Sequence, residues 1–186
     1  MFNRRERDRG FTLVELAIVL AGFATLTAIS VPGINAFVAA QRARNGARTV
    51  ERTLQNARLK AVSSSRSLRV RFTCPTTGTL RILELTGVAG TDNAGNRCDP
   101  TAYPSPGPAD VLRSTPSLDS PVILLPKGTA VAGSPTTLEF TPRGTVFAVG
   151  SGGAVTPLAG DVVWTVTQGS YVNTVTINAL GRVRLN

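Results

Sequence analysis

One acidic residue, Glu15, stands alone in a long apolar segment near the start of the chain. No residue between positions 16 and 41 is ionisable, and this stretch exceeds the ~20 residues that a helix needs to cross the hydrocarbon core of a bilayer. A carboxylate inside such a helix costs on the order of 3 kcal/mol on insertion scales and marks a functional site by default. The chemistry open to Glu15 is ion pairing, for which it needs a cationic partner.

The rest of the chain is poorly equipped for catalysis or metal binding. The sequence has no histidine, and its 11 acidic residues show no paired arrangement. Histidine is the most common general base and transition-metal ligand, and no nucleophile has an identifiable base beside it. We therefore expect no enzyme activity, no metal site and no cofactor.

Two cysteines, Cys74 and Cys98, fit either one disulfide in an oxidising compartment or two free thiols in a reducing one. The apolar segment, which would anchor the chain in a membrane, favours the disulfide. Such a bond would contribute about 3 kcal/mol in the chain-entropy picture.

A short charged leader precedes the apolar segment. Residues 1–10 contain four arginines and end in Gly10, which Phe11 follows. A secretory signal peptide has its apolar region before the cleavage site, whereas a cut between Gly10 and Phe11 would leave the apolar helix on the mature protein. The arginines favour a cytoplasmic leader, and a large domain after the span can cross the membrane largely regardless of its charge.

The segment Arg9–Leu16, Arg-Gly-Phe-Thr-Leu-Val-Glu-Leu, closely resembles the prepilin signature of type IV pilins and type II secretion pseudopilins. The resemblance implies that a prepilin peptidase cuts after Gly10 and that the same enzyme N-methylates the new N-terminal Phe11. Glu15 stands at the position of the family's hallmark glutamate, and Pro32 at that of its helix-disrupting proline.

Cleavage would create the cation that Glu15 needs. The α-amino group of Phe11 would be positive at neutral pH, and Glu15 could pair with it within its own chain or with the terminus of a neighbouring subunit. Pairing between neighbours would set the axial register of subunits as each is added at the membrane. The alternative is an ordinary single-pass anchor, which leaves the Gly10–Phe11 junction unexplained.

The expected fold class is α+β, with a long N-terminal helix packed on a C-terminal antiparallel β-rich head. The helix is predicted over 11–62, as a membrane-spanning half (11–40) and a periplasmic half (41–62), with a bend or local opening near Pro32 because proline removes a backbone donor. In the second half, apolar residues recur at roughly helical period: Val50, Leu54, Ala57, Leu59 and Ala61.

The β-rich head is predicted over 63–186. Residues 68–72 alternate between apolar side chains and arginine, which is typical of a half-exposed strand. Residues 87–121 are rich in Gly, Pro, Asp, Asn and Ser and indicate a long loop, tied at Cys98, and Trp164 is expected in the core. Further strands are predicted at 80–85, 122–125, 137–140, 145–149, 161–167, 171–178 and 182–185.

This arrangement of a long helix and about eight short strands resembles the GspH/FimT branch of the pilin superfamily, as do the segments 138–145 and 179–185. The resemblance implies that part of the β-fold covers the second half of the helix. The loop at 87–121 is long for that branch.

Basic residues gather in the second half of the helix, in the first strand and at the C-terminus, and the formal net charge is +9. Arg182 and Arg184 would point the same way on a strand and could bind successive phosphates. Gly181-Arg182-Val183-Arg184 resembles, residue by residue, the C-terminal Gly-Arg-x-Arg motif through which some FimT-type minor pilins bind DNA in natural transformation. Arg143 could join this patch if its turn lies nearby.

The motif makes double-stranded DNA a candidate partner. Aromatic residues make up only 5% of the chain, so binding would rely on phosphates rather than base stacking, and would be sequence-independent and salt-sensitive. The arginines could instead line the filament interior, contact lipid headgroups or pair with acidic groups of neighbouring subunits.

The predicted function is that of a minor pilin or pseudopilin, assembled at or near the tip of a type IV pilus or a type II secretion pseudopilus. Its expected partners are the prepilin peptidase, other pilin or pseudopilin subunits and the inner-membrane assembly machinery. We expect a single-pass protein of the bacterial inner membrane, with a cytoplasmic leader and a periplasmic head, that later enters the filament.

Overall fold

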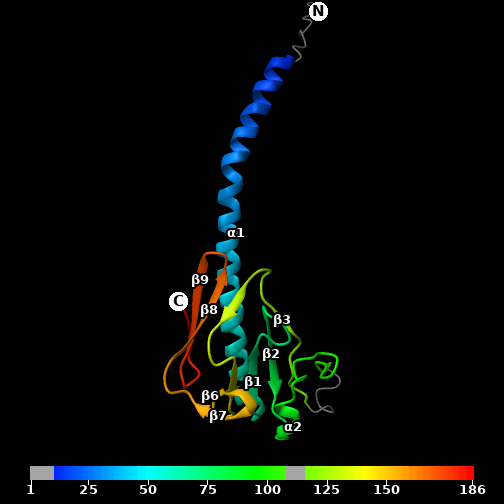
Figure 1. Ribbon diagram of the computed structural model, residues 1–186, viewed down its shortest axis with the longest axis vertical. Coiled ribbons are helices and arrows are strands. Elements are labelled where there is room, and N and C mark those ends of the chain that lie inside the picture. Colours follow the sequence, from blue (N-terminus) through cyan, green and yellow to red (C-terminus); the bar gives the residue numbers. More distant parts are fainter. Residues whose placement is uncertain (1–10, 108–115) are drawn as a thin grey trace, which may run out of the picture. The chain divides into compact units, whose positions relative to one another are not determined.

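A single helix, α1 (Leu13–Ser64), forms the first part of the chain. The computed structural model describes residues 11–107 and 116–186, so the leader at 1–10 lies outside the described residues. The chain divides into two units, Met1–Val38 and Ala39–Asn186, and α1 continues from the first into the second. All strands belong to the second unit, which we call the head (Figure 1).

The observed bounds of α1 lie close to the predicted range of 11–62. At its C-terminal end Ser65 adopts a left-handed φ of 54°, and the Arg66 N–H donates to the carbonyl of Ala61 at 3.2 Å. This is the hydrogen bond of a Schellman cap, in which glycine is the usual left-handed residue. The helix is continuous through Pro32, so the predicted local opening is absent, and the bend there stays a prediction.

The second half of α1 presents an apolar stripe to the head. Its fully buried residues are three or four positions apart, as a helical period requires: Ala43, Ala47, Val50, Leu54, Ala57 and Ala61. The prediction was wrong for Leu59, which is 66% exposed. Leu59 is two positions from Ala57 and from Ala61, so it lies on a different face of the helix.

Ten strands are present among the described residues, and they form two antiparallel sheets. The larger sheet has the order β3-β2-β1-β5-β6-β7. Its strands are β1 (Leu68–Phe72), β2 (Thr79–Glu84), β3 (Ile123–Leu124), β5 (Thr137–Phe140), β6 (Val146–Val149) and β7 (Val155–Pro157). The smaller sheet has the order β10-β9-β8-β4. Its strands are β4 (Ala130–Ala132), β8 (Val162–Gln168), β9 (Tyr171–Ile177) and β10 (Val183–Leu185).

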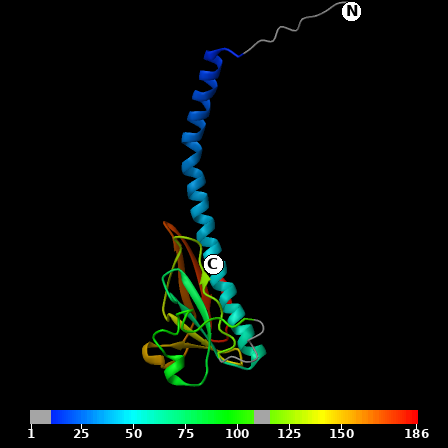
Figure 2. The ribbon, with the colours of Figure 1, turned by 90° about the vertical axis from the view of Figure 1, so that its right-hand side faces the viewer.

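One apolar cluster joins the stripe of α1 to both sheets, and Figure 2 shows the strands of the head lying along the second half of the helix. Trp164 on β8 is 1% exposed and stacks on Phe72 of β1, with 5.0 Å between the ring centroids. Its indole N–H donates to the carbonyl of Pro135 at 3.2 Å, so its polar atom is also satisfied. The expected core position of Trp164 is confirmed, and so is the covering of the second half of the helix by the β-fold.

The segment between β2 and β3 is mostly irregular, as the sequence predicts. It contains one short helix, α2 (Ala89–Asp92), and its residues 108–115 lie outside the described part of the chain. Two short strands, β4 and β7, were not predicted. Residues 150–154 join β6 to β7 and include the short 3₁₀ helix η1 (Ser151–Gly153).

Candidate functional site

Thr12 and Glu15 form reciprocal hydrogen bonds at the start of α1. The Thr12 N–H and its hydroxyl each donate to Oε2 of Glu15 at 2.9 Å, and the Glu15 N–H donates to Oγ1 of Thr12 at 3.2 Å. This is a capping box, in which two otherwise unsatisfied N–H groups at a helix start are bonded by side chains. The Thr-x-x-Glu spacing could have revealed the role of Thr12, which was not among the predicted site residues.

The first half of α1 is apolar on all sides and exposed within its own unit. Leu13, Leu20, Phe23 and Leu26 are each more than half exposed. The helix is long and apolar enough to cross a membrane, by length and composition. A helix that is hydrophobic all round is stable only when another apolar phase covers it, so these residues need a lipid or protein environment outside their own fold.

The C-terminal arginines lie on the exposed side of the head. Arg182 and Arg184 are both exposed. Arg184 is paired with Thr176 of β9, and the strand geometry of β10 directs its side chain away from the apolar cluster, which Val183 and Leu185 contact. The turn before β10 is held by the Asn178 side chain, which accepts a hydrogen bond from the Arg182 N–H at 2.9 Å.

Gly181 lies against two other parts of the head. Its φ is +73°, and a Cβ atom built on it would lie 2.8 Å from Cδ of Arg58 and 2.8 Å from the carbonyl oxygen of Gly144. Arg58 on α1 in turn donates from Nε to that carbonyl at 3.2 Å. Glycine is therefore required at position 181 both by the backbone conformation and by the close approach of Arg58. The turn that carries Arg143 is thus adjacent to Gly181, as the sequence allowed.

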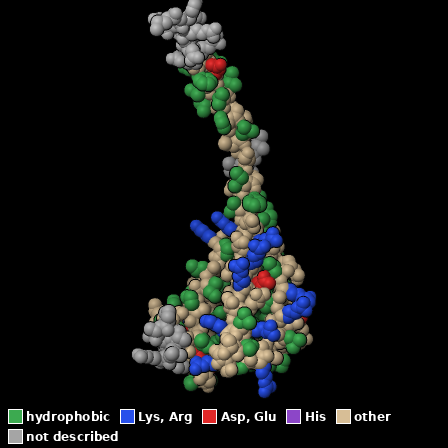
Figure 3. Space-filling model, turned by 180° about the vertical axis from the view of Figure 1, so that it is seen from behind, with side chains coloured by type: hydrophobic (Ala, Val, Ile, Leu, Met, Phe, Trp, Pro, Cys, Tyr) green, Lys and Arg blue, Asp and Glu red, His purple; other side chains and the backbone are tan. Residues whose placement is uncertain are grey.

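Arg44, Arg48 and Arg52 are exposed on α1, on the single helix face that their four-residue spacing predicts. The face of the molecule in Figure 3 shows Lys and Arg side chains spread over the head, with few carboxylates among them. Arg44, Arg48 and Arg52, like Arg182 and Arg184, are therefore available to a partner.

The arginines of β1 have a different role. Arg69 is 5% exposed; its Nε donates to Glu139 at 3.0 Å and its Nη1 donates to Oδ1 of Asn93 at 2.7 Å. Arg71 donates to the carbonyl of Asp92 at 3.0 Å. The prediction of a half-exposed strand was therefore wrong, because the segment after β2 lies over the outer face of β1 and takes up its arginines.

Two further arginines, neither of them singled out in the sequence, are fully buried beneath the same segment. Arg81 donates to the carbonyl oxygens of Ser120, Cys98 and Tyr103. Arg97 forms an ion pair with Asp119, donates to the carbonyl of Glu84 at 3.0 Å and lies 4.5 Å from the centre of the Tyr103 ring.

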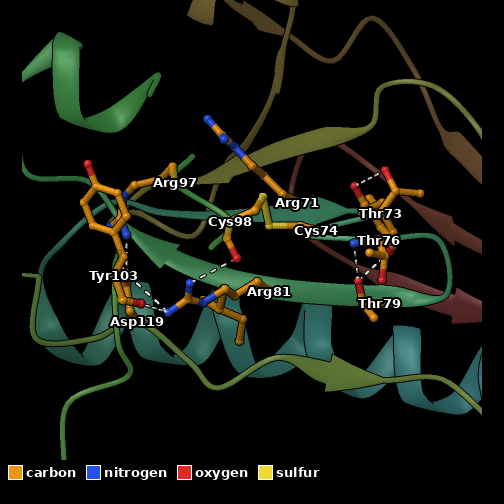
Figure 4. The surroundings of a disulfide bond; sticks show 12 residues. Arg71, Thr73, Cys74, Thr76, Thr79, Arg81, Arg97, Cys98, Tyr103 and Asp119 are labelled. Atoms are coloured by element: carbon orange, nitrogen blue, oxygen red, sulfur yellow. Dashed lines mark hydrogen bonds and ion pairs between the residues drawn. A yellow bond between two sulfur atoms is a disulfide. The ribbon is translucent and has the colours of Figure 1, made fainter. Parts of the chain in front are cut away.

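Cys74 and Cys98 form a disulfide with a Cα–Cα distance of 5.2 Å, as the membrane anchor favoured. Figure 4 shows the bond among Arg71, Arg81 and Arg97. It links the end of β1 to the segment that covers β1, so one covalent bond and several arginine hydrogen bonds hold the same segment. These interactions keep arginines on the inside of the head and remove them from any binding surface.

The acidic residue Glu84 completes this interior network. Its carboxylate pairs with Arg66 and accepts from the N–H of Leu118 at 2.9 Å and from the N–H of Ser117. Burial raises the pKa of Glu84, but the hydrogen bond from Arg66 and those from Leu118 and Ser117 outweigh burial and hold the pKa below its ordinary value.

The pKa values of two arginines in this interior network, Arg71 and Arg81, are lowered. Burial lowers the pKa of Arg71, and the charges of Arg69 and Arg97 lower it further, with Asp92 acting in the opposite direction. Burial also lowers the pKa of Arg81, which Asp119 opposes. Guanidinium groups remain charged at neutral pH even so. Among the described residues, no group of three or more His, Cys, Asp or Glu side chains could hold a metal ion.

Comparisons with known proteins give the family. A model described as "Type II transport protein GspH" matches residues 46–181, which is the head without residues 39–45 and without its last strand, β10. Two crystal structures of the type IV minor pilin FimU from Pseudomonas aeruginosa PAO1 are similar over 77% of this chain. The aligned regions cover 87% and 91% of the two FimU chains, with 16% and 15% sequence identity and TM-scores of 0.49 and 0.48. No curated protein matches the sequence.

The family match includes the helix stripe from residue 47, all the strands of both sheets except β10, and the segment that the disulfide links to β1. It agrees with the resemblance to the GspH/FimT branch that the motifs of the sequence indicated. Because the matched region exceeds half of the chain, the chain belongs to the GspH family of pilin-like proteins.

Proposed function

We propose that this chain is a minor pilin or pseudopilin subunit of a type IV pilus or a type II secretion pseudopilus. A prepilin peptidase cuts it between Gly10 and Phe11 and N-methylates Phe11. The inner-membrane machinery then adds the subunit at or near the tip of the filament, where its neighbours are other pilin or pseudopilin subunits. Before assembly the head lies in the periplasm and the leader in the cytoplasm.

The observation that carries this proposal is the contrast between the two halves of α1. The second half has a narrow stripe that its own head covers, whereas the first half is apolar on every side and exposed within its unit. Lipid would cover the first half before assembly, and the corresponding helices of neighbouring subunits would cover it in a filament.

Glu15 supports assembly rather than simple anchoring. Its Oε2 is bonded to Thr12 of the same chain, while the second oxygen, Oε1, has no hydrogen-bond partner among the described residues. A free Oε1 could accept the α-amino group of Phe11 from a neighbour without opening the capping box. Pairing through Oε1 would set the axial register of one subunit against the next.

Three substitutions separate the charge of Glu15 from its capping role. Glu15→Gln keeps an oxygen acceptor for the Thr12 N–H but has no charge, Glu15→Ala loses both, and Thr12→Val keeps the charge and loses the hydroxyl. We expect both Glu15 variants to be processed normally and to enter filaments about tenfold less than the wild type, as the loss of an interaction of ~1.4 kcal/mol predicts. Thr12→Val should retain most incorporation.

Filaments sheared from cells would be quantified by immunoblot, and mass spectrometry would establish the N-terminus of the subunit. A first residue other than N-methylated Phe11 would contradict the processing step. Wild-type incorporation of Glu15→Gln would contradict the charge pairing and leave the capping box as the sole role of the residue.

DNA binding is a second candidate function, favoured by one observation. Arg182 and Arg184 are exposed, and the adjacent Gly181 lies against Arg58 and the turn of Arg143, so basic residues from three segments are neighbours. A protein that neutralises several phosphates should lose affinity steeply with salt, with a slope of about 0.9 per neutralised phosphate.

Binding of duplex DNA by the detergent-solubilised protein would be measured from low to moderate salt. We expect the variant Arg182→Ala/Arg184→Ala to reduce the salt slope by about 2, because each arginine would neutralise one phosphate. An unchanged slope and affinity would exclude these two residues as the DNA site. Lys127→Ala, which removes an exposed cation ahead of β4, is the matched control.

A further inference from the structure

The outer edge of β10 carries main-chain groups that no neighbouring strand uses. β10 is the terminal strand of the smaller sheet. Asn186 exchanges both of its main-chain hydrogen bonds with Thr174, at 2.9 and 3.0 Å. Pairs along an antiparallel ladder alternate between bonded and non-bonded. The N–H and C=O groups of Val183 and Leu185 therefore point away from β9, and neither N–H has a partner among the described residues.

Two hollows adjoin these residues, one at each end of β10, and α1 lines part of both. One has a volume of about 300 Å³ and is lined by Val183 together with Gln55 and Leu59 of the helix. The other has a volume of about 440 Å³ and is lined by Leu185, by Ala40 of the helix and by the first residues of β9, Tyr171, Val172 and Asn173. Figure 2 shows the C-terminal segment beside α1. A hollow with space for side chains therefore adjoins each end of the free edge, and we call the two hollows together the groove.

The charge around this groove is positive. Arg58 and Arg182 line the first hollow and Arg44 lines the second, and no Asp or Glu lines either of them. Arg184 lies on the opposite face of β10 from the groove and is exposed. The acidic residue nearest along the helix, Glu51, already accepts a hydrogen bond from the Gln55 amide at 3.2 Å.

We propose that this edge binds an extended segment of a second polypeptide in which apolar and acidic side chains alternate. A segment paired with β10 would form its hydrogen bonds opposite Val183 and Leu185. Side chains opposite these two residues would share their face and enter the hollows beside α1. The side chain between them would share the face of Arg184 and meet its guanidinium group. The recognised pattern is apolar–acidic–apolar.

The main-chain pattern favours a polypeptide over a nucleic acid at this edge. Phosphate groups can accept hydrogen bonds from the two free N–H groups, but they have no donors for the carbonyl oxygens of Val183 and Leu185. A strand supplies both kinds of group, as in other cases of strand addition to an exposed sheet edge. The proposal goes beyond filament assembly, because it concerns what the head binds rather than how the helix is inserted.

Peptide binding tests this assignment directly. The probe is the fluorescently labelled peptide acetyl-Glu-Val-Glu-Val-Glu-amide, titrated with the full-length protein in non-ionic detergent and followed by fluorescence anisotropy. N-methylation of either valine removes an N–H that would bond to β10, whereas N-methylation of the central glutamate alters an N–H that would point away. We expect the first change to weaken binding about five- to tenfold, as the loss of one hydrogen bond predicts, and the second to have little effect.

Two protein variants provide the complementary test. Val183→Pro removes one outward N–H and leaves the pairing with β9 intact, as proline on an edge strand allows, and Arg184→Glu reverses the charge that meets the central acid. Both should weaken binding at least fivefold by the same reasoning. Lys127→Glu, the same charge change ahead of the opposite edge strand β4, should not.

Equal binding of the two kinds of N-methylated peptide would overturn the proposal, because charge attraction alone would then account for the binding. Duplex DNA that displaces the peptide and binds the Val183→Pro variant normally would also overturn it and assign the surface to phosphates. Since the assay involves no filament, neither result bears on the assembly proposal.

Discussion

Two groups of arginines in the head differ in a way that the sequence does not show. Arg69, Arg81 and Arg97 are at most 5% exposed and donate to carboxylates and carbonyls of their own chain. Arg182 and Arg184 are exposed and belong to the free edge of the smaller sheet. The first group stabilises the segment that covers β1, whereas the second group, like the exposed arginines of α1, is available for binding.

The difference shows that net charge overstates the basic surface of this protein. A buried guanidinium needs hydrogen-bond acceptors, because removal from water costs several kcal/mol per ion, and of these three arginines only Arg97 has a buried donor, Nε, without a partner among the described residues. The segment between β2 and β3 supplies the acceptors, chiefly main-chain carbonyls and the carboxylate of Asp119. Substitutions in the two groups should therefore act on different properties, namely stability for the first and binding for the second.

Arg97→Ala should have the largest effect on stability. It leaves the buried carboxylate of Asp119 with only Arg81 as a neighbouring cation, at 4.0 Å. We expect the free energy of unfolding to fall by about 3–5 kcal/mol, the usual cost of breaking a buried ion pair. Denaturant unfolding would measure it. A decrease smaller than about 1 kcal/mol would show that the interior arginines do not support the fold.

Removal of the disulfide should rank next. The double substitution Cys74→Ala/Cys98→Ala opens a loop with a sequence separation of 24 and should lower the free energy of unfolding by about 3 kcal/mol. The effect should be smaller than in Arg97→Ala, because the arginine hydrogen bonds still hold the segment. Urea unfolding of the oxidised protein and of the double variant under the same conditions would measure it, and an equal midpoint would contradict the prediction.

A pH dependence should follow from Glu84. Its pKa is lowered in the folded protein from the ordinary 4.5, so the unfolded chain binds a proton first as the pH falls. The stabilisation is therefore complete above about pH 4.5 and is lost as the pH decreases through the folded value. Unfolding between about pH 7 and about pH 3 should show a steeper loss of stability in the wild type than in Glu84→Gln. Parallel curves would show that Glu84 does not contribute.

Substitution of the exposed arginines should have the smallest effect on stability. Arg182→Ala/Arg184→Ala should change the free energy of unfolding by less than about 0.5 kcal/mol, as is usual for exposed residues without buried partners. Thermal unfolding followed by circular dichroism would test this. A larger decrease would place these arginines with the interior group and weaken both binding proposals.

The elements set by local patterns were predicted well. Residue type and spacing predict the spacing of apolar residues along α1, the C-terminal end of this helix near residue 62, and the core position of Trp164. The structure confirms these predictions, apart from Leu59. The strands at β5, β6, β8 and β9 lie within about two residues of their predicted bounds. Such features depend on neighbours in the sequence, which is why the sequence alone reveals them.

The features that were missed depend on contacts between distant residues. An arginine alternating with apolar residues indicates an exposed face, and nothing near Arg69 in the sequence shows that residues more than twenty positions away cover it. β4 and β7 have three residues each and become strands only by pairing with β8 and β6. The capping role of Thr12 could have been predicted from its spacing to Glu15.

Gly181 determines the position of a further arginine, Arg58, which belongs to neither group. Arg58 keeps its hydrogen bond to the Gly144 carbonyl only because position 181 has no side chain. A single methyl group there would push the guanidinium of Arg58 off that carbonyl and into solvent beside Arg182. One added carbon atom would thus enlarge the cationic surface without altering the formal charge of the protein.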